Sequence, residues 1–317
     1  MRQSQGINTA FVDIEDVYDE FSFGQKTPTA LKEFLAFAKT NWQQAPRYVL
    51  LAGDASLDPK NYLGFGDYDF VPTKLIDTQF METASDEWFA DFDNNGTSEI
   101  AIGRLPVRTL QETFNVVSKI IGYEQSIGSN DVLLVSDSNE GFDFENASKQ
   151  LKALIPDTVR VEEIHRGALG TDVAKGNLLR ALSQGKKIVN YNGHGNIDQW
   201  KGDLLSSADA RELFNGQSPS LFISMTCLNG YFQDAALESL SESLLKAERG
   251  GAVAVWASTG MTNPTEQAVM NRELFRRIFT DSSMTLGDAI IKAKSVVRDS
   301  DVRRTWVLLG DPSMHIK

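Results

Sequence analysis

The feature that most constrains the fold is an alternation of short apolar runs with longer amphipathic stretches, from residue 131 to the end of the chain. Short apolar strands joined by helices favour a mostly parallel sheet that is covered by helices on both faces. We therefore expect an α/β fold with a six-stranded, doubly wound sheet. The six expected strands are DVLLVSD (131–137), VRVEEIH (159–165), KKIVNYN (186–192), SLFISMT (220–226), GAVAVWAS (251–258) and TWVLLG (305–310).

The first part of the chain is organised differently. PTALKEFLAFAKTNW (28–42) predicts a helix, because Pro28 is well placed at a helix start and the apolar residues follow. RYVLLAGD (47–54) and SEIAIGRLPV (98–107) predict strands, and a second helix is expected to begin near Thr109. The length of 317 residues is large for one core. We therefore place a boundary near Ser126, with a smaller α/β subdomain over 1–126 and a larger one over 127–317.

Composition excludes several classes of protein. The net charge of −12 and the pI near 4.8 argue against a nucleic-acid partner, because there is no basic stripe to neutralise phosphates. No stretch approaches ~18 uncharged apolar residues, so we expect no membrane span. The single cysteine excludes an internal disulfide framework and a cysteine-cluster metal site.

Two consecutive predicted strands end at chemically reactive residues. His194, held between Gly193 and Gly195, follows KKIVNYN, and Cys227 follows SLFISMT. The two strands are joined by a helical crossover, so their carboxyl ends are expected at one edge of the sheet, where such folds bind ligands. A thiol beside an imidazole is the arrangement of a cysteine nucleophile with its general acid/base. We expect the imidazole to lower the pKa of the thiol below that of free cysteine.

The two glycines have a further use in this chemistry. They allow a substrate to approach the backbone closely. The amide groups of Gly195 and Cys227 could then hold a developing oxyanion. Two structural alternatives stay open from the residues alone. Cys227 could be a small buried thiol, and His194 could cap a turn.

NYNGHGN and SMTCLNGYF, with His194 and Cys227 33 positions apart (227 − 194), resemble the catalytic segments of the gingipain family of cysteine peptidases. YVLLAGD, EIAIGRLPV, GGAVAVWASTG and WVLLGDPSMHI resemble the same family in the same order. The resemblance implies a caspase-like three-layer α/β/α sandwich and cysteine endopeptidase activity, with no cofactor needed for the chemistry. It implies Cys227 as nucleophile, His194 as general acid/base and the amides of Gly195 and Cys227 as oxyanion hole. It also implies an acidic residue near the histidine, for which Asp137 is the nearest match; the alternative for Asp137 is a helix or turn cap.

The resemblance also bears on specificity. Well-known gingipains cleave after Arg or Lys, using an acidic residue at the start of the helix that follows this strand. In GFDFENASKQL the corresponding residues are Asp143 and Glu145, and each could equally be an N-terminal helix charge. The segment after WASTG is shorter than in those relatives, at the place where they build an aromatic pocket wall.

A separate acidic loop, DFDNNGTSE, suggests a structural calcium site. Asp91, Asp93, Asn95 and Glu99 stand at the first, third, fifth and ninth positions of a calcium-loop pattern, with Gly96 at the turn. The alternative is a hairpin turn, because Asn-Gly is a strong turn dipeptide.

The leading interpretation is a secreted or cell-surface cysteine endopeptidase that acts on peptides or proteins, with its signal peptide absent from this sequence. One alternative is a transpeptidase or sorting peptidase of the same fold. Another is a catalytically silent surface binding module. The sequence leaves the oligomeric state open.

Overall fold

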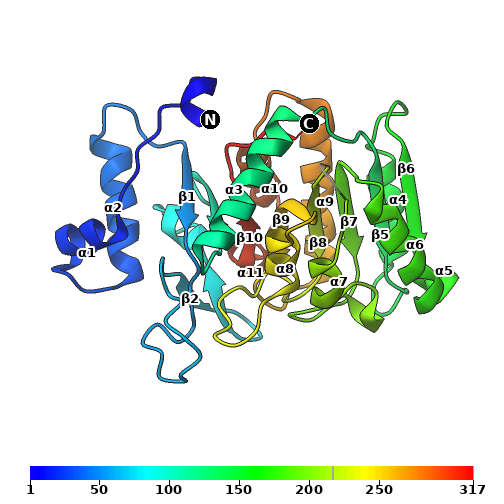
Figure 1. The fold of residues 1–317 in the computed structure, drawn as a ribbon, viewed down its shortest axis with the longest axis horizontal. Coiled ribbons are helices and arrows are strands. Elements are labelled where there is room, and N and C mark those ends of the chain that lie inside the picture. The colour runs from blue at the N-terminus through cyan, green and yellow to red at the C-terminus, as the bar shows by residue number, and fades with distance from the viewer. Residues whose placement is uncertain (216–217, 317) are drawn as a thin grey trace.

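The structure is a computed structural model that describes residues 1–215 and 218–316. Within these residues the core is an eight-stranded sheet with the order β1-β4-β10-β9-β8-β7-β5-β6 (Figure 1). Strands β5 to β9 run parallel to one another, and β10 runs antiparallel to β9. The strands are β1 (Tyr48–Ala52), β4 (Ala101–Leu105), β5 (Val132–Ser136), β6 (Val161–His165), β7 (Ile188–Asn192), β8 (Ser220–Met225), β9 (Ala252–Ser258) and β10 (Trp306–Leu309).

All six strands expected in the second part of the chain form, and the mostly parallel α/β class is confirmed. The expected number of strands in the sheet was wrong, because β1 and β4 from the first part extend it to eight among the described residues. The physical reason is the position of β10. One of its edges pairs with β9 and the other accepts β4, so the sheet continues past β10. One sheet therefore crosses the expected boundary at residue 126, and the division there remains a prediction.

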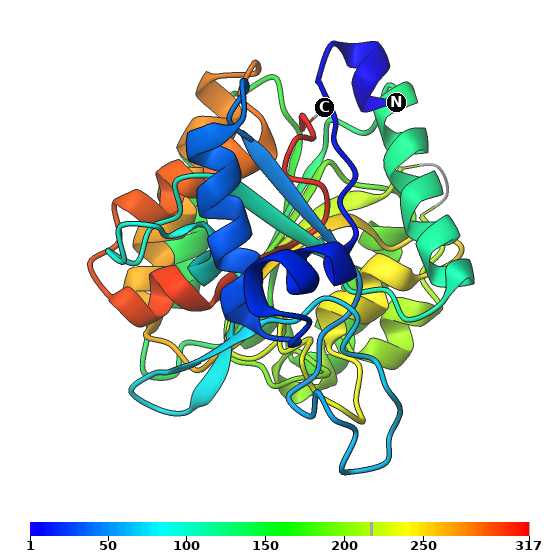
Figure 2. The same ribbon diagram turned by 90° about the vertical axis from the view of Figure 1, so that its left-hand side faces the viewer.

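Helices cover both faces of this sheet. α4 (Phe144–Lys152), α9 (Pro264–Thr280) and α10 (Leu286–Ser295) pack on one face, and α3 (Leu110–Gln125), α7 (Ser207–Arg211) and α8 (Leu240–Lys246) pack on the other. Figure 2 shows the two helical layers with the sheet between them. The central strands β5, β7, β8 and β9 are buried along their whole length, as expected for strands covered on both faces. The arrangement is the expected three-layer sandwich.

The remaining helices lie at the ends of the sheet and in connections. Near β1 are α1 (Ile14–Ser22) and α2 (Pro28–Asn41), which pack against each other (Figure 1). α2 and α3 confirm the two helices expected in the first part. The others are α5 (Arg166–Leu169), α6 (Thr171–Ser183), α11 (Ser300–Thr305) and the 3₁₀ helices η1 (Arg2–Gln5), η2 (Glu87–Ala90) and η3 (Lys201–Asp203).

The connection from β1 to β4 holds a hairpin that sequence analysis missed. β2 (Lys74–Asp77) pairs antiparallel with β3 (Glu82–Ser85). The segment before Asn95-Gly96 forms the 3₁₀ helix η2 instead of a strand, so the alternative of a hairpin turn at that dipeptide was wrong. The hairpin is tied to the main sheet by a buried ion pair, in which the Arg104 guanidinium on β4 donates to both carboxylate oxygens of Asp86 at 2.7 and 2.8 Å.

Candidate active site

His194 and Cys227 lie at neighbouring positions on one edge of the sheet. β7 and β8 are parallel neighbours, and their register pairs Asn192 with Met225. His194 follows Asn192 by two residues and Cys227 follows Met225 by two residues, so both leave the sheet at the same edge. Paired strands lie about 4.8 Å apart, which puts the two backbones within side-chain reach of each other. His194 is exposed and Cys227 is half-buried.

The imidazole of His194 is held by the loop that follows β5. Its Nε2 atom lies 3.2 Å from the backbone carbonyl oxygen of Glu140. The edge of the Phe144 ring packs against it, with ring centroids 5.1 Å apart and planes at 79°. A carbonyl oxygen only accepts, so Nε2 carries the proton in this contact. In the neutral ring the Nδ1 atom is then a free acceptor, as a general base requires.

The thiol of Cys227 has a different partner. Its Sγ atom lies 3.8 Å from the carbonyl oxygen of Thr262, which belongs to the segment after β9. Burial raises the pKa of the Cys227 thiol, and the contact with Thr262 opposes this rise only in part. The expectation of a lowered thiol pKa was therefore wrong for this arrangement, because desolvation disfavours the thiolate. Cys227 rests here as a neutral thiol.

The glycine after the histidine is required by space. A Cβ atom on Gly195 would lie 2.8 Å from the Thr226 hydroxyl and 3.0 Å from the Gln199 carbonyl oxygen. Within the described residues, the amide N–H groups of Gly195 and Cys227 donate no hydrogen bond to the protein. Two free amides at the ends of β7 and β8 match the requirement for an oxyanion-binding pair.

The Asp137 side chain contacts the backbone of His194 and not its imidazole ring. The carboxylate is fully buried, and one oxygen accepts the His194 backbone N–H at 3.2 Å. The other accepts from Arg166 Nε at 2.6 Å and from the Ser138 amide at 2.7 Å. Asp137 therefore lies near the histidine, as the resemblance implied, but its carboxylate bonds to the His194 backbone N–H and not to the imidazole.

Asp143 and Glu145 are the sequence neighbours of Phe144, whose ring packs against the His194 imidazole. The Asp143 carboxylate caps α4 by accepting the Asn146 amide at 2.9 Å, which is the structural alternative considered above. Glu145 is half-buried at the first turn of the same helix. The structure thus gives Asp143 a local structural role and leaves the specificity role of either residue as a prediction.

The acidic loop uses its carboxylates on its own backbone. Asp91 accepts the amides of Asn95 and Gly96 at 2.9 and 2.8 Å. Glu99 accepts the Asp93 amide and pairs with Lys39. Among the described residues, no group of three or more His, Cys, Asp or Glu side chains is placed to hold a metal ion. Calcium binding by Asp91, Asp93, Asn95 and Glu99 therefore stays a prediction from the sequence.

Three residues of the site were missed by sequence analysis: Glu140, Phe144 and Thr262. Each follows a strand that ends at the edge carrying His194 and Cys227, since Glu140 and Phe144 come after β5 and Thr262 comes after β9. The rule that ligands bind at carboxyl ends of parallel strands pointed to these segments. It could not select the residues, because Glu140 and Thr262 contribute backbone carbonyl oxygens, which every residue has.

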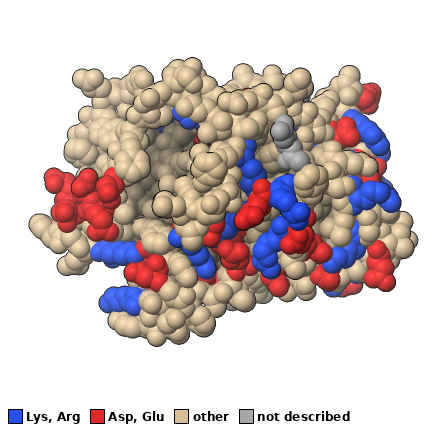
Figure 3. Space-filling model, in the orientation of Figure 1, with Lys and Arg blue, Asp and Glu red and all other residues tan. Residues whose placement is uncertain are grey.

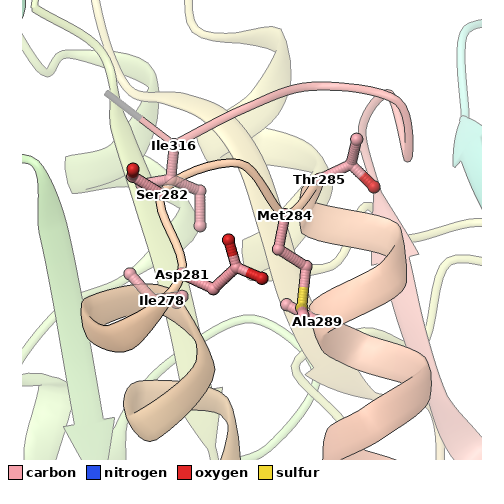
Figure 4. A pocket seen from close by; sticks show the side chains of 7 residues that line it. All are labelled: Ile278, Asp281, Ser282, Met284, Thr285, Ala289 and Ile316. Atoms are coloured by element: carbon pink, nitrogen blue, oxygen red, sulfur yellow. The ribbon is translucent and has the colours of Figure 1, made fainter.

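A small pocket lies elsewhere, between the end of α9, the start of α10 and the C-terminal segment (Figure 4). Its lining includes Ile278, Met284 and Ile316. The same end of α9 meets the residue before β7, because the ammonium group of Lys187 lies 5.8 Å from the Phe279 ring centroid. The pocket is therefore at the amino end of β7, opposite the edge that carries His194.

Surface charge is unevenly distributed. Figure 3 shows acidic side chains gathered over α1, whereas the two signs are mixed over much of the rest of this face. The exposed carboxylates of α1 are Glu15, Asp16, Asp19 and Glu20. α1 packs on α2 near β1, which is an edge strand, whereas β7 and β8 lie on the far side of β9 and β10. The acidic cluster is therefore not part of the His194–Cys227 site. No described helix is long and apolar enough to cross a membrane.

A histidine and a cysteine at adjacent strand ends of a three-layer α/β/α sandwich define the class of caspase-like cysteine peptidases. The family model for peptidase family C25 matches residues 1–317, and the chain belongs to this family. The resemblance to the gingipain family is thereby confirmed.

Curated relatives and solved structures agree. Gingipain R2 and gingipain R1 of Porphyromonas gingivalis are each 22% identical to this chain over 277 residues, which is 80% of this chain but 37% and 27% of those proteins. The chain thus matches well under half the length of these relatives. A complex of the Porphyromonas gingivalis RgpB pro- and mature domains has a TM-score of 0.79 at 18% identity, over 96% of this chain and 77% of that chain. The Arg-specific cysteine proteinase gingipain R has a TM-score of 0.77 at 19% identity, over 100% and 76%. The structural likeness shows the fold.

Proposed function

We propose that this chain is a cysteine endopeptidase that hydrolyses peptide bonds through Cys227 and His194, after Arg or Lys. The observation that carries the proposal is that Cys227 and His194 each follow, by two residues, a residue of the pair Met225 and Asn192 on the neighbouring strands β8 and β7. The His194 Nε2 atom also faces the Glu140 carbonyl oxygen. Membership of peptidase family C25 supports the same chemistry.

The first half of the reaction forms an acyl-enzyme. The Nδ1 atom of His194 removes the Sγ proton of Cys227, and the thiolate attacks the carbonyl carbon of the peptide bond. The amides of Gly195 and Cys227 donate to the oxyanion, and each such donor is worth roughly 10²–10³ in rate. His194 then returns the proton to the leaving amine as the C–N bond breaks, which leaves a thioester on Cys227.

The second half releases the product. His194 removes a proton from water as the water oxygen attacks the thioester carbonyl. The C–S bond breaks, the new carboxylic acid leaves, and the proton returns to the Cys227 sulfur. In the resting arrangement the thiol is neutral, because burial raises its pKa. Proton transfer to His194 therefore accompanies attack in this proposal, and a preformed ion pair is not required.

The preference for Arg or Lys is supported by the carboxylates beside the imidazole. Phe144 contacts His194, and its neighbours Asp143 and Glu145 bring two negative charges to the same end of α4. A substrate cation in a partly desolvated cleft would gain a charge-assisted hydrogen bond from such a group. The similar gingipain R is described as Arg-specific. Asp143 already caps α4 with one oxygen, so we assign the recognition role first to Glu145.

The test is a peptide library that varies the residue before the cleaved bond, digested by the wild type and by Cys227→Ala. Cleavage after Arg and Lys that disappears in Cys227→Ala is the expected result. Cleavage only after other residues would overturn the specificity but leave the dyad, and no cleavage by the wild type would overturn the peptidase proposal. Adding an amine nucleophile to the same reaction separates hydrolysis from acyl transfer by the mass of the product.

A matched pair of variants assigns the specificity residue. Asn caps helices about as well as Asp, so Asp143→Asn keeps α4 capped while it removes the charge. Glu145→Gln removes the other charge. Glu145→Gln should lower kcat/KM for Arg substrates by a factor of about 10 or more relative to neutral substrates, as expected for a charged hydrogen bond worth roughly 1.5–3 kcal/mol. The opposite ranking of the two variants would assign the role to Asp143.

A further inference from the structure

The backbone N–H and carbonyl oxygen of His194 both form hydrogen bonds with buried side chains. Its N–H donates to the Asp137 carboxylate at 3.2 Å. Its carbonyl oxygen accepts the Tyr191 hydroxyl at 2.7 Å and the Lys201 backbone N–H at 2.8 Å. Asp137 and Tyr191 are both 0% exposed, although His194 itself is exposed. The backbone of an exposed residue at a strand end could bond to water instead, so these protein partners are not required by burial of His194.

Asp137 is itself held in place by other groups. The carboxylate forms an ion pair with Arg166, whose Nη2 atom also donates to the Ser138 hydroxyl at 2.8 Å. The Asp137 amide donates to the Asn192 carbonyl oxygen at 2.9 Å, so β5 and β7 remain paired up to the catalytic segment. The backbone of Asp137 is therefore held by the pairing of β5 with β7.

The Tyr191 side chain is held in place by ring stacking. The Tyr191 ring lies parallel to the indole of Trp200, with centroids 4.2 Å apart and planes at 8°. Trp200 is fully buried, and the next residue, Lys201, donates its amide to the same His194 carbonyl oxygen. Burial raises the pKa of Tyr191 well above its ordinary value, so the hydroxyl stays protonated and remains a donor.

These two side chains explain the glycine before the histidine. A Cβ atom on Gly193 would lie 2.5 Å from Asp137 Cβ and would collide with the Tyr191 hydroxyl. Gly193 does not have a positive φ, so space and not backbone conformation requires glycine there. Asp137 and Tyr191 thus converge on the backbone of the catalytic segment from two sides.

We propose that Asp137 and Tyr191 are positioning residues that clamp the backbone of His194, and so hold its imidazole at the distance from Cys227 that proton transfer requires. The clamp acts on the reaction only through His194 and touches no substrate. With the N–H and C=O groups fixed, the Cα–Cβ direction is fixed, and the Glu140 carbonyl oxygen then selects the orientation of the ring. The inference rests on the proposed function, because it assigns how the general acid/base of that reaction is placed.

The experiment combines Tyr191→Phe and Asp137→Asn with His194→Ala in double-mutant cycles. In the wild-type background each clamp variant should lower kcat roughly 10- to 100-fold with little change in KM, which is the order expected for a misplacement of about 1 Å. In the His194→Ala background the same variants should change the residual rate by less than about twofold, since there is no imidazole left to position. Equal losses in both backgrounds would overturn the clamp and indicate a general structural role.

Two controls keep the result interpretable. Tyr18→Phe alters another buried tyrosine, on α1 and away from this edge, and should leave kcat unchanged. Asp137→Asn breaks the pair with Arg166 and could fail to fold, whereas Tyr191→Phe removes only a hydroxyl, so Tyr191→Phe carries the test alone if necessary.

A readout without substrate separates this inference from the proposed function. Hydrogen exchange of the His194 amide, followed by NMR, should be slow in the wild type and at least about tenfold faster in Asp137→Asn, because the amide loses its charged acceptor. Slow exchange combined with no peptide cleavage would leave the clamp standing and remove the peptidase proposal. Unchanged exchange in a folded Asp137→Asn variant would overturn the clamp.

Discussion

The backbone carbonyl oxygen of Glu140 lies 3.2 Å from Nε2 of His194, while the carboxylate of the same residue pairs with Lys201. The main chain of Glu140 thus contacts the His194 ring, and its side chain forms an ion pair on the surface. The hydrogen bond with Lys201 lowers the pKa of the Glu140 carboxyl, which favours its ionised form. The partner of the imidazole Nε2 atom is therefore a backbone group of the loop after β5 and not the Glu140 side chain.

From this relationship we predict that Glu140→Ala retains most of the activity. Exposed ion pairs contribute about 0–1 kcal/mol, so losing the pair with Lys201 should lower kcat/KM by no more than about fivefold. Steady-state kinetics on a short peptide substrate measures this. A loss of a thousandfold would show that the carboxylate itself acts on the ring.

The dyad should behave as a unit. Cys227→Ala and His194→Ala should each lower kcat by more than about 10³, and the double variant should be hardly worse than either single one, because both take part in the same proton and acyl transfers. Kinetics of the three variants under one set of conditions provides the comparison. Losses that simply multiply would mean that the two side chains act independently.

The pH dependence of Cys227 alkylation should show that the thiol is neutral in the resting protein. Burial raises the thiol pKa, so the thiolate fraction grows only toward alkaline pH. The rate of reaction with iodoacetamide should therefore keep rising beyond pH ~8.5, where free cysteine is half ionised. Cys227 is the only cysteine in the chain, so the mass of the adduct assigns the reaction. A plateau already reached near pH 6 would indicate a preformed thiolate–imidazolium pair.

A buried carboxylate on α8 should make stability depend on pH. Glu242 is fully buried, and burial raises its pKa to about 8 despite the neighbouring ammonium group of Lys246. The charges of Asp54 and Glu238 act in the same direction as burial. Between about pH 4.3 and 8 the folded state then holds a proton that the unfolded chain has released. The free energy of unfolding should fall as the pH rises through this window.

Glu242→Gln tests this slope. The amide oxygen of Gln can still accept from the backbone N–H of Ser239, which caps α8. Urea unfolding from pH 5 to 8 should show a smaller loss of stability in Glu242→Gln than in the wild type. Glu212→Gln, which alters an exposed carboxylate paired with Arg249, should keep the wild-type slope. Identical slopes in all three proteins would contradict the assignment.

Removing one partner of the ion pair between Arg104 and Asp86 should strongly lower the stability of the protein. Both side chains are buried, and the guanidinium also donates to the carbonyl oxygens of Gly53 and Pro72. Asp86→Ala leaves the buried cation without its counter-charge, which should cost about 3–5 kcal/mol of stability. Urea denaturation measures this, with Glu212→Ala expected to lose no more than about 1 kcal/mol. A loss of stability as small as that of the control would mean that the carbonyl oxygens alone stabilise the buried charge of Arg104.

The strands of the second part and the two reactive residues were determined by the sequence alone. Short apolar runs with intervening amphipathic stretches specify strands and helices locally, since periodicity is a local property. His194 and Cys227 were found because each is the reactive residue directly after such a strand. Their separation of 33 positions along the chain (227 − 194) was not needed for that step. The helical crossover between two consecutive strands was sufficient to expect neighbours.

Only the tertiary structure decided which groups serve these two residues. The extension of the sheet by β1 and β4 depends on pairing across about 200 residues of chain, which no local pattern encodes. The Glu140 and Thr262 carbonyl oxygens and the Gly195 amide are backbone groups, and backbone groups do not distinguish one residue type from another. Asp137 was found as a residue near the histidine, but its role changed, because the direction of a carboxylate depends on what else fills the space around it. Gly193 is glycine because Asp137 and Tyr191 meet there, and that meeting exists only in the folded chain.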